Sequence, residues 1–251
     1  MEVYLNKVTG IDDALVSMMM SNRVWTKERE DEVREMCSIC TDDAGALKKI
    51  INNSNSARLL NEEIAKLSKK IDSLVKIGKR HITLLRFIDF SFTVNGLHRA
   101  GQDDWDAHAY RFNNRIVRAS SRQQRNPVKT EDKSDWYKGK ILSTDEMLEK
   151  CNIDIPKEVE LDGQKFVKVM NGYAVADLKE DPDVLRGLWM QSWPSIFIFK
   201  VNLVDWCHVY QERNSEGNAH PEVKMLAESC AATITAAIPQ FNRELFMEVK
   251  S

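Results

Sequence analysis

The stretch FIDFSFTVN at residues 87–95 decides the fold class. Polar residues alternate there with four apolar ones: Ile88, Phe90, Phe92 and Val94. This alternation is typical of a β-strand that buries one face. We therefore predict a strand over residues 87–95, and we interpret Asn95-Gly96 directly after it as a turn. Together with the helical patterns before and after it, this strand predicts a mixed α+β domain, with a twisted sheet around residues 87–95 that is flanked by helices.

The residues before this strand, 1–80, are predicted to form a helical N-terminal region. A charged stretch at residues 27–34 is typical of a solvated helix face, and Asp42 and Asp43 are candidate caps for a helix over 44–51. A stripe of apolar residues then steps 4, 3, 4, 3 through Leu60, Ile64, Leu67, Ile71 and Leu74. It covers about two heptads, which favours a core-facing helix or an oligomer contact over an extended coiled coil. Gly78 is a fitting helix end.

The segment after the strand, residues 97–123, is rich in arginine. Four of its arginines step 4, 3, 4 and would share one face of a helix: Arg111, Arg115, Arg118 and Arg122. Like charges at this spacing repel each other by a few tenths of a kcal/mol per pair. Two interpretations remain open. In the first, the face is exposed and acidic neighbours reduce the repulsion between its arginines. In the second, the face is an anion site, because guanidinium groups bind phosphate in a bidentate way.

The second half of the chain divides into an insertion and a more regular part. Within one domain over residues 1–251, we predict an insertion at 124–180, with a capped helix from Ser143 to Lys150 and a strand or hairpin around Asn171-Gly172. Residues 184–191 are predicted to be helical, and 196–201 to form a strand or the start of a buried helix. Pro221 is a good first residue for a helix over 222–237, which Pro239 ends.

Composition excludes several classes of protein. The chain has 251 residues, of which 43% are hydrophobic and 29% charged, so it can form a core and is not wholly disordered. Its net charge of −2 argues against a generic polyanion binder, and we expect no nucleic-acid partner. No run of 18 apolar residues suggests a membrane span, and the N-terminus lacks signal-peptide character. Five cysteines without framework spacing indicate reduced thiols and a cytoplasmic protein.

Sequence motifs for several chemistries are missing or weak. The ten glycines are scattered and form neither a phosphate-binding loop nor a dinucleotide fingerprint. The pair Cys37 and Cys40 is a lone CxxC without a second pair or nearby histidines, so we expect no metal site. Cys207 and His208 are adjacent, so their side chains diverge, which argues against a nucleophile–base pair.

Four stretches, in the right order, resemble the flavin-dependent thymidylate synthases, the ThyX family. His81-Ile82-Thr83 leads into the strand, as a His-x-Ser/Thr segment does in that family. The arginine segment ends in Ser120-Ser121-Arg122, similar to a Ser-x-Arg signature. Arg186 lies sixteen residues before Asn202, and residues 202–213 read NLVDWCHVYQER, similar to the family's Asn-x-Arg-Ser-x-x-His/Asn-x-x-x-x-Arg. The resemblance covers residues 78–123 and 182–245.

The resemblance implies a ThyX-like α+β fold with a twisted, mainly antiparallel sheet flanked by helices. It also implies a reaction and a site. It implies a homotetramer that methylates dUMP with 5,10-methylenetetrahydrofolate, FAD and NADPH. The positions that bind the pyrimidine nucleotide would be Ser120, Arg122, Arg186 and Arg213, with Arg213 and Ser120 acting in catalysis. The positions that contact FAD would be His81, Thr83, Arg111, Asn202 and His208. Two structural alternatives stay open: Asn202 as the cap of the following helix, and His208 as a core histidine with its hydrogen bonds satisfied. Because the flavin and folate carry the chemistry, no protein nucleophile is required.

The chain also departs from the family pattern. Where the family has Arg-His-Arg, this chain has Arg111-Phe112-Asn113, and where it has Glu-His it has Arg86-Phe87. Val204 stands where the family has an arginine. These changes lie on the flavin and folate side, and His108, Arg111 and Arg115 are candidate substitutes for the lost groups. Two alternatives follow: an enzyme that modifies another pyrimidine nucleotide, for example by hydroxymethylation, and a non-catalytic nucleotide-binding protein.

Overall fold

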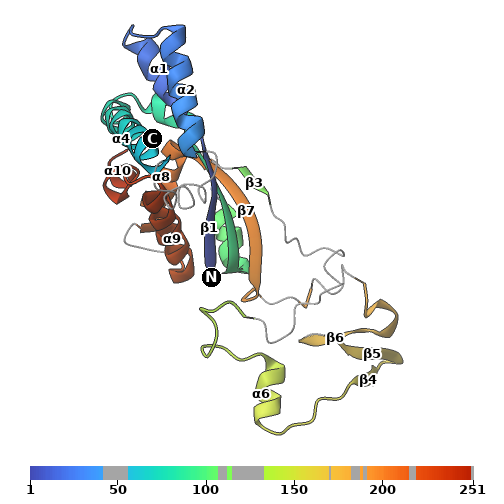
Figure 1. The fold of residues 1–251 in the computed structure, drawn as a ribbon. Coiled ribbons are helices and arrows are strands. Elements are labelled where there is room, and N and C mark those ends of the chain that lie inside the picture. Colours follow the sequence, from blue (N-terminus) through green and yellow to red (C-terminus); the bar gives the residue numbers. More distant parts are fainter. Residues whose placement is uncertain are drawn as a thin grey trace. The chain divides into compact units, whose positions relative to one another are not determined.

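The computed structural model describes residues 1–41, 56–106, 112–114, 133–169, 171–181, 187–188, 191–214 and 219–249 (Figure 1). The side chains of residues 39–41, 56–61, 63 and 112–114 are outside the description. The chain divides into two compact units. Unit 1 comprises Met1–Glu2, Val94–Ala107 and Arg115–Phe197, and unit 2 comprises Val3–Thr93, His108–Asn114 and Ile198–Ser251.

The main sheet has four strands in the order β1-β2-β7-β3. Their bounds are β1 (Glu2–Thr9), β2 (Asp89–His98), β7 (Pro194–Asn202) and β3 (Phe112–Asn114). The short β3 pairs antiparallel with β7, with Phe112 opposite Lys200. Helices and antiparallel sheets together confirm the predicted α+β class.

The predicted alternation of buried apolar and polar side chains along β2 is confirmed, and its apolar residues lie in the core. Ile88 just before the strand and Phe90, Phe92 and Val94 within it are all fully buried. The ring of Phe92 stacks on that of Phe199 from β7, with 4.9 Å between centroids. Burying one large apolar side chain contributes roughly 1.5–3 kcal/mol, so this row is a main source of the sheet's stability.

The predicted turn at Asn95-Gly96 is wrong, because β2 continues to His98. Gly96 has φ +97° and lies against the chain start, where an added Cβ would be 3.2 Å from the Cα of Met1. Gly96 therefore allows the backbone of Met1 to lie close to it within a strand. Glycine allows such close approaches in strands, as well as the conformations that turns need.

The prediction that residues 1–80 are helical is wrong for Glu2–Thr9, which form β1. This strand alternates only weakly, since most of its side chains are exposed or half-buried. It is fixed partly by a polar contact, in which Asn6 Nδ2 donates to Thr93 Oγ1 at 2.9 Å. Gly10 then has φ +80°, and a Cβ there would lie 1.8 Å from the Phe87 carbonyl oxygen.

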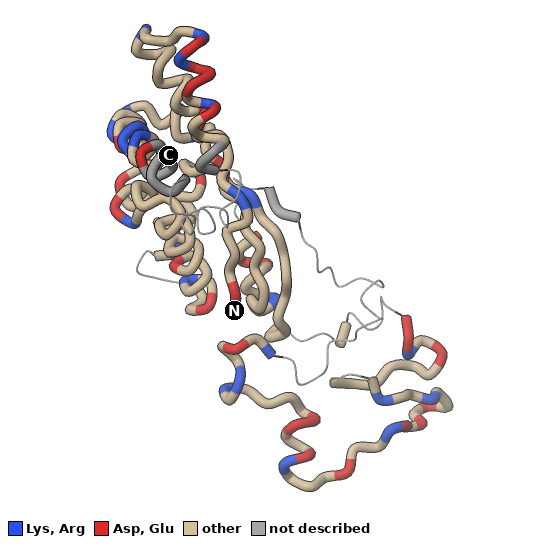
Figure 2. The backbone as a smooth tube through the Cα atoms, in the orientation of Figure 1, with Lys and Arg blue, Asp and Glu red and all other residues tan. Residues whose placement is uncertain are grey.

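Helices α1 (Ile11–Ser21), α2 (Lys27–Thr41) and α4 (Ser56–Gly78) follow β1. Figure 2 shows acidic and basic residues interspersed along α2, as expected for a solvated face. In α4 the stripe is confirmed as core-facing over Leu67, Ile71 and Leu74, which are buried. The side chain of Leu60 and the predicted helix at 44–51 lie outside the described residues. The helix ends at Gly78 as predicted, where a Cβ would lie 2.5 Å from Leu85 Cδ2.

After β2 comes helix α5 (Arg99–Asp106), and the structure then rules out one helix through the arginine segment. Residues 112–114 form β3, so a continuous helical face from Arg111 to Arg122 is wrong. The four arginines of that face lie outside the described residues.

Residues 124–180, which we predicted to be an insertion, contain helix α6 (Thr144–Lys150) and a three-stranded antiparallel sheet in the order β4-β5-β6. The sheet comprises β4 (Glu158–Leu161), β5 (Gln164–Val169) and β6 (Gly172–Val175), followed by the short turn η3 (Ala176–Leu178). The predicted capping box is confirmed, since Ser143 Oγ accepts the Glu146 N–H and Glu146 accepts the Ser143 N–H. The hairpin around Asn171-Gly172 is also confirmed. The Asp162-Gly163 turn, with both φ angles positive, was not predicted.

The C-terminal part contains α8 (Leu203–Asn214), α9 (Pro221–Ala237) and α10 (Arg243–Glu248). The apolar run at 196–201 is a strand, and Pro221 is the first residue of α9, as predicted. Most of the predicted helix at 184–191 lies outside the described residues. Across the described part of the chain, every helix is too short or too polar to cross a lipid bilayer.

Candidate functional site

Helix α8 buries one face, and it carries two candidate residues of the fourth stretch, His208 and Arg213. Its buried residues are Leu203, Val204, Trp206, Cys207, Val209 and Tyr210. Trp206 packs against Phe92 of β2 and against Tyr210 and Phe246, with ring centroids 6.0–6.1 Å apart. This packing fixes the helix, so the polar side chains of its other face are held in defined positions.

Asn202 caps the start of α8. Its Oδ1 accepts the N–H of Asp205 at 2.9 Å, and its Nδ2 donates to the Asp205 carboxylate at 2.6 Å. An N-cap satisfies a backbone donor that the helix itself leaves without a partner. Asn202 therefore has a structural role, and both polar atoms of its amide are engaged.

His208 and Arg213 follow on the same helix. His208 Nε2 lies 3.2 Å from Glu212 Oε1, and the side chain is 31% exposed, so His208 is not a core histidine. Arg213 is half-buried in the last turn, where a cation interacts favourably with the helix dipole. Arg213 lies five residues after His208, so the two half-buried side chains leave the helix about 140° apart around its axis.

Cys207 and Val204 belong to the opposite, buried face. Burial raises the pKa of the Cys207 thiol to about 12, so it carries almost no thiolate near pH 7. This supports the expectation that Cys207 and His208 form no catalytic pair. Val204 is fully buried, so the position where ThyX proteins have an arginine contributes to the core of this chain.

The segment before β2 carries the other two candidates that the structure describes. His81 precedes the 3-10 helix η1 (Ile82–Phe87), and Thr83 lies in its first turn. Leu84 and Leu85 anchor η1 in the core, and η1 contacts α1, α4 and α8. The backbone link to α8 is direct, since the Leu203 N–H donates to the Ile88 carbonyl at 2.8 Å.

His81 and Thr83 line a cavity of about 510 Å³ in unit 2, a size common for small-molecule sites. Ser21 and Asn22 from the end of α1, and Lys76 and Arg80 from the end of α4, contribute its other polar groups. These four residues were not predicted as site residues. Their signal in the sequence is the basic stretch from Lys76 to Arg80, directly before His81. We interpreted Gly78 within this stretch only as the end of a helix.

The structure therefore brings His81 and Thr83 together at one cavity, and it places His208 and Arg213 on α8, with Asn202 just before that helix. The other predicted site residues lie outside the described residues: Arg111, Ser120, Arg122 and Arg186. The candidate substitutes His108 and Arg115 lie outside them as well.

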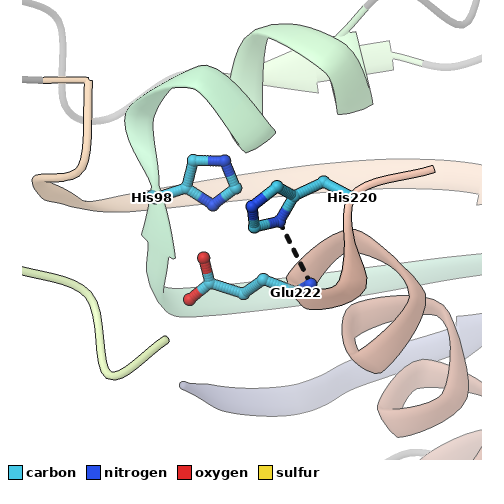
Figure 3. A group of neighbouring side chains, drawn as sticks. All are labelled: His98, His220 and Glu222. Carbon is cyan, nitrogen blue, oxygen red and sulfur yellow. Dashed lines mark hydrogen bonds between the residues drawn. The ribbon is translucent and has the colours of Figure 1, made fainter. Parts of the chain in front are cut away.

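The start of α9 contains a histidine cap. His220 Nδ1 accepts the N–H of Glu222 at 3.2 Å (Figure 3). Glu222 is itself only 2% exposed, in the first turn of α9. Figure 3 also draws His98, the last residue of β2 in unit 1, whose ring packs edge-on against Tyr137 at 5.2 Å.

The antiparallel sheet, its helices and the candidate residues on η1 and α8 define the class: an α+β protein with the fold of the flavin-dependent thymidylate synthases. The chain belongs to the family of thymidylate synthase complementing proteins, Thy1, whose model matches residues 23–240. This confirms the resemblance to ThyX proteins.

Two solved structures show the likeness in fold. One is the flavin-dependent thymidylate synthase ThyX from Helicobacter pylori complexed with FAD and dUMP, at 16% identity and TM-score 0.51, with all of both chains covered. The other is thymidylate synthase X from the same organism with FAD and dUMP, at 13% identity and TM-score 0.51, covering 98% of this chain and all of that one. No curated protein matches the chain.

Proposed function

We propose that this protein is an FAD-dependent thymidylate synthase, which methylates dUMP to dTMP with 5,10-methylenetetrahydrofolate and NADPH. The observation that carries the proposal is the family match over residues 23–240. The fold is that of ThyX structures that hold FAD and dUMP, which supports the same ligands here.

The donor set of the cavity at η1 fits an anionic cofactor such as FAD. The described residues that line it include two cations, an imidazole, two hydroxyl groups and an amide, and none of them is Asp or Glu. We assign His81 and Thr83 to the flavin, together with Arg111, with Asn202 at the end of β7 and with His208 of α8. When bound, FAD supplies hydride transfer, which no side chain can perform.

The nucleotide is assigned to arginines. Arg213 in the last turn of α8, with Arg122 and Arg186, would hold the phosphate of dUMP in bidentate hydrogen bonds. One of these guanidinium groups and the hydroxyl of Ser120 would polarise a uracil carbonyl and stabilise the charge that develops there. Arg213 and Ser120 are the catalytic residues of this proposal, and the buried Cys207 has no part in it.

Three further features belong to the same proposal. The protein would act as a homotetramer in the cytoplasm, and residues 124–180 would be an insertion within a single domain. Gel filtration with light scattering measures the first of these. A mass near four times 28.9 kDa is expected, and a monomer would contradict it.

Product analysis tests the proposed reaction. Purified protein is incubated with FAD, NADPH, methylenetetrahydrofolate and labelled dUMP, and we expect labelled dTMP. A hydroxymethylated nucleotide would favour the first alternative, and nucleotide binding without any product would favour a non-catalytic protein.

The variant Arg213→Ala tests the site. We expect loss of dUMP binding with the fold intact, as judged by circular dichroism. Arg243→Ala is the matched control, because Arg243 is an exposed arginine of unit 2 that pairs with Glu228. Unchanged dUMP affinity in Arg213→Ala would contradict the assignment.

A further inference from the structure

An open groove of about 560 Å³ lies in unit 2 between the end of α9 and the start of α10 (Figure 1). Its lining includes Ala232, Thr235, Ala236, Asn242, Arg243 and Glu244. None of the described residues that line it is a candidate for flavin or nucleotide binding, and most of its exposed surface is apolar. The groove therefore needs an explanation of its own.

The neutral polar side chains of the groove are engaged within the chain. Thr235 Oγ1 donates to the Phe241 carbonyl at 2.9 Å, and Asn242 Oδ1 accepts the N–H of Leu245 at 3.2 Å. A partner that covered the groove would leave both hydrogen bonds in place. Because burial is costly mainly for polar groups that lose their hydrogen bonds, this groove can be buried at little cost.

The charges of the groove favour an apolar partner that also carries a cation. Arg243 already forms an ion pair with Glu228. Glu244 is exposed and has no ion pair within the described part of the chain. A carboxylate beside an apolar groove favours an occupant with a Lys or Arg next to its apolar side chain, because complementary charges select the partner.

The exposed face of α9 carries this combination itself. Met225 is 52% exposed, and Lys224 directly precedes it. Four residues step 4, 3, 4 and share one face of the helix: Met225, Ser229, Ala232 and Ala236. The Ser229 hydroxyl donates to the Met225 carbonyl at 2.8 Å, so it needs no partner from outside. This face therefore has a large apolar side chain near its start and the groove at its end.

We propose that α9 pairs antiparallel with α9 of a second copy of this chain, so that Met225 of each copy enters the groove of the other. A two-fold axis midway between Ser229 and Ala232 places these two residues opposite each other. The same axis places Met225 opposite Ala236, so one contact satisfies both copies. Because alanine side chains are small, the two helix axes can approach to about 8 Å.

The bland explanation is that Met225 and the alanines are ordinary surface residues, since single exposed apolar side chains are common. That explanation does not account for a groove at the place where a symmetric pairing requires one. It also does not account for the charges, because the pairing places Lys224 of one copy at the same end of the helix pair as Glu244 of the other. The pairing would supply one contact surface of the proposed oligomer, and it does not depend on the proposed reaction.

Variants at both ends of the face test the pairing, with sedimentation velocity as the measurement of mass in solution. Met225→Glu and Ala236→Glu each place a carboxylate in the contact. We expect each to halve the mass of the wild-type oligomer, or to raise its dissociation constant at least about tenfold. Met247→Glu is the matched control and should keep the wild-type mass, because Met247 is 53% exposed on α10 and does not line the groove. All three positions are exposed, so the circular dichroism spectra should be unchanged.

A charge swap tests whether Lys224 meets Glu244 across the contact. Lys224→Glu and Glu244→Lys should each weaken association, and the double variant should restore it, because opposite charges then face each other again. A monomeric wild-type protein, or folded Met225→Glu and Ala236→Glu variants that keep the wild-type mass, would overturn the proposal. A wild-type oligomer that these variants split but that forms no dTMP would refute the proposed function and leave the pairing standing.

Discussion

Helix α8 in unit 2 and helix α6 in unit 1 are both short, but different forces hold them. Half of the residues of α8 are buried. The ring of Trp206 packs against Phe92 and Phe246, and the ring of Tyr210 packs against Phe246. Helix α6 buries none of its residues. It is held by the capping box of Ser143 and by ion pairs of Glu146 with Lys133 and of Asp145 with Lys168. The comparison teaches that apolar packing fixes the helix that carries His208 and Arg213, while helix α6 depends on its cap and on ion pairs.

The largest expected effect comes from Trp206→Ala. It removes a fully buried indole from the frame of α8, and such truncations cost about 3–5 kcal/mol of unfolding free energy. Urea unfolding of the full chain measures the loss. Trp206→Phe is the control and should lose less than half as much, because most of the packing is kept. A loss below about 1 kcal/mol in Trp206→Ala would break the comparison.

The next effect concerns the charge network of α6. Hydrogen bonds from Lys133 and from the Ser143 backbone lower the pKa of Glu146 from 4.5 to about 2. A carboxyl group whose pKa is lowered in the folded state stabilises it above its ordinary pKa and ceases to do so as the pH falls through the folded value. We therefore expect protection of residues 143–150 from amide hydrogen exchange to decrease between about pH 4.5 and pH 2.

Glu146→Gln should remove this pH dependence and about 1.5–3 kcal/mol of local stability, since it replaces a charged acceptor of a buried lysine. Glu149→Gln on the same helix is the control, because Glu149 is exposed. If both variants kept the wild-type exchange profile, the ion pair would contribute nothing and the comparison would fail.

Two variants of Asn202 distinguish its structural role as the cap of α8 from its proposed role in flavin binding. Asn202→Ala should cost about 1 kcal/mol of stability, because the cap of the helix is lost. Asn202→Ser keeps a side-chain acceptor and should regain most of this stability, yet flavin affinity should stay reduced, since the amide is absent. Full flavin affinity in the serine variant would show that Asn202 is only a cap.

The smallest effect is expected for Lys79→Ala. Lys79 pairs with Glu248, but both side chains are more than a third exposed, and such surface pairs contribute roughly 0–1 kcal/mol. Thermal unfolding should shift little. A loss as large as that in Glu146→Gln would mean that burial does not decide the strength of these ion pairs.

Sequence patterns predicted the helices and strands whose buried side chains recur at the spacing of a single secondary-structure type. The alternation of Phe90 and Phe92, the 3-4 spacing of Leu67, Ile71 and Leu74, and the cap at Ser143 each report a local physical preference. Glu2–Thr9 was missed because a mostly exposed strand shows no strong alternation. Asn95-Gly96 misled because a glycine at φ +97° fits a close approach as well as a turn.

The candidate site could be predicted only in part. The resemblance to ThyX proteins named His81, Asn202, His208 and Arg213 as candidates, and the alternative of Asn202 as a helix cap is confirmed. No pattern indicated that Lys76 shares a cavity with His81. The cavity forms where α1, α4 and η1 meet, and contacts between distant segments leave no periodic signal in the sequence.

One titration tests the central claim most directly. FAD is added to the purified protein, its visible absorbance is recorded, and dUMP is then added. The account predicts a bound-flavin spectrum that dUMP perturbs in the wild-type protein, and a spectrum that dUMP leaves unchanged in Arg213→Ala. A folded wild-type protein that binds no flavin, with or without dUMP, would contradict the account.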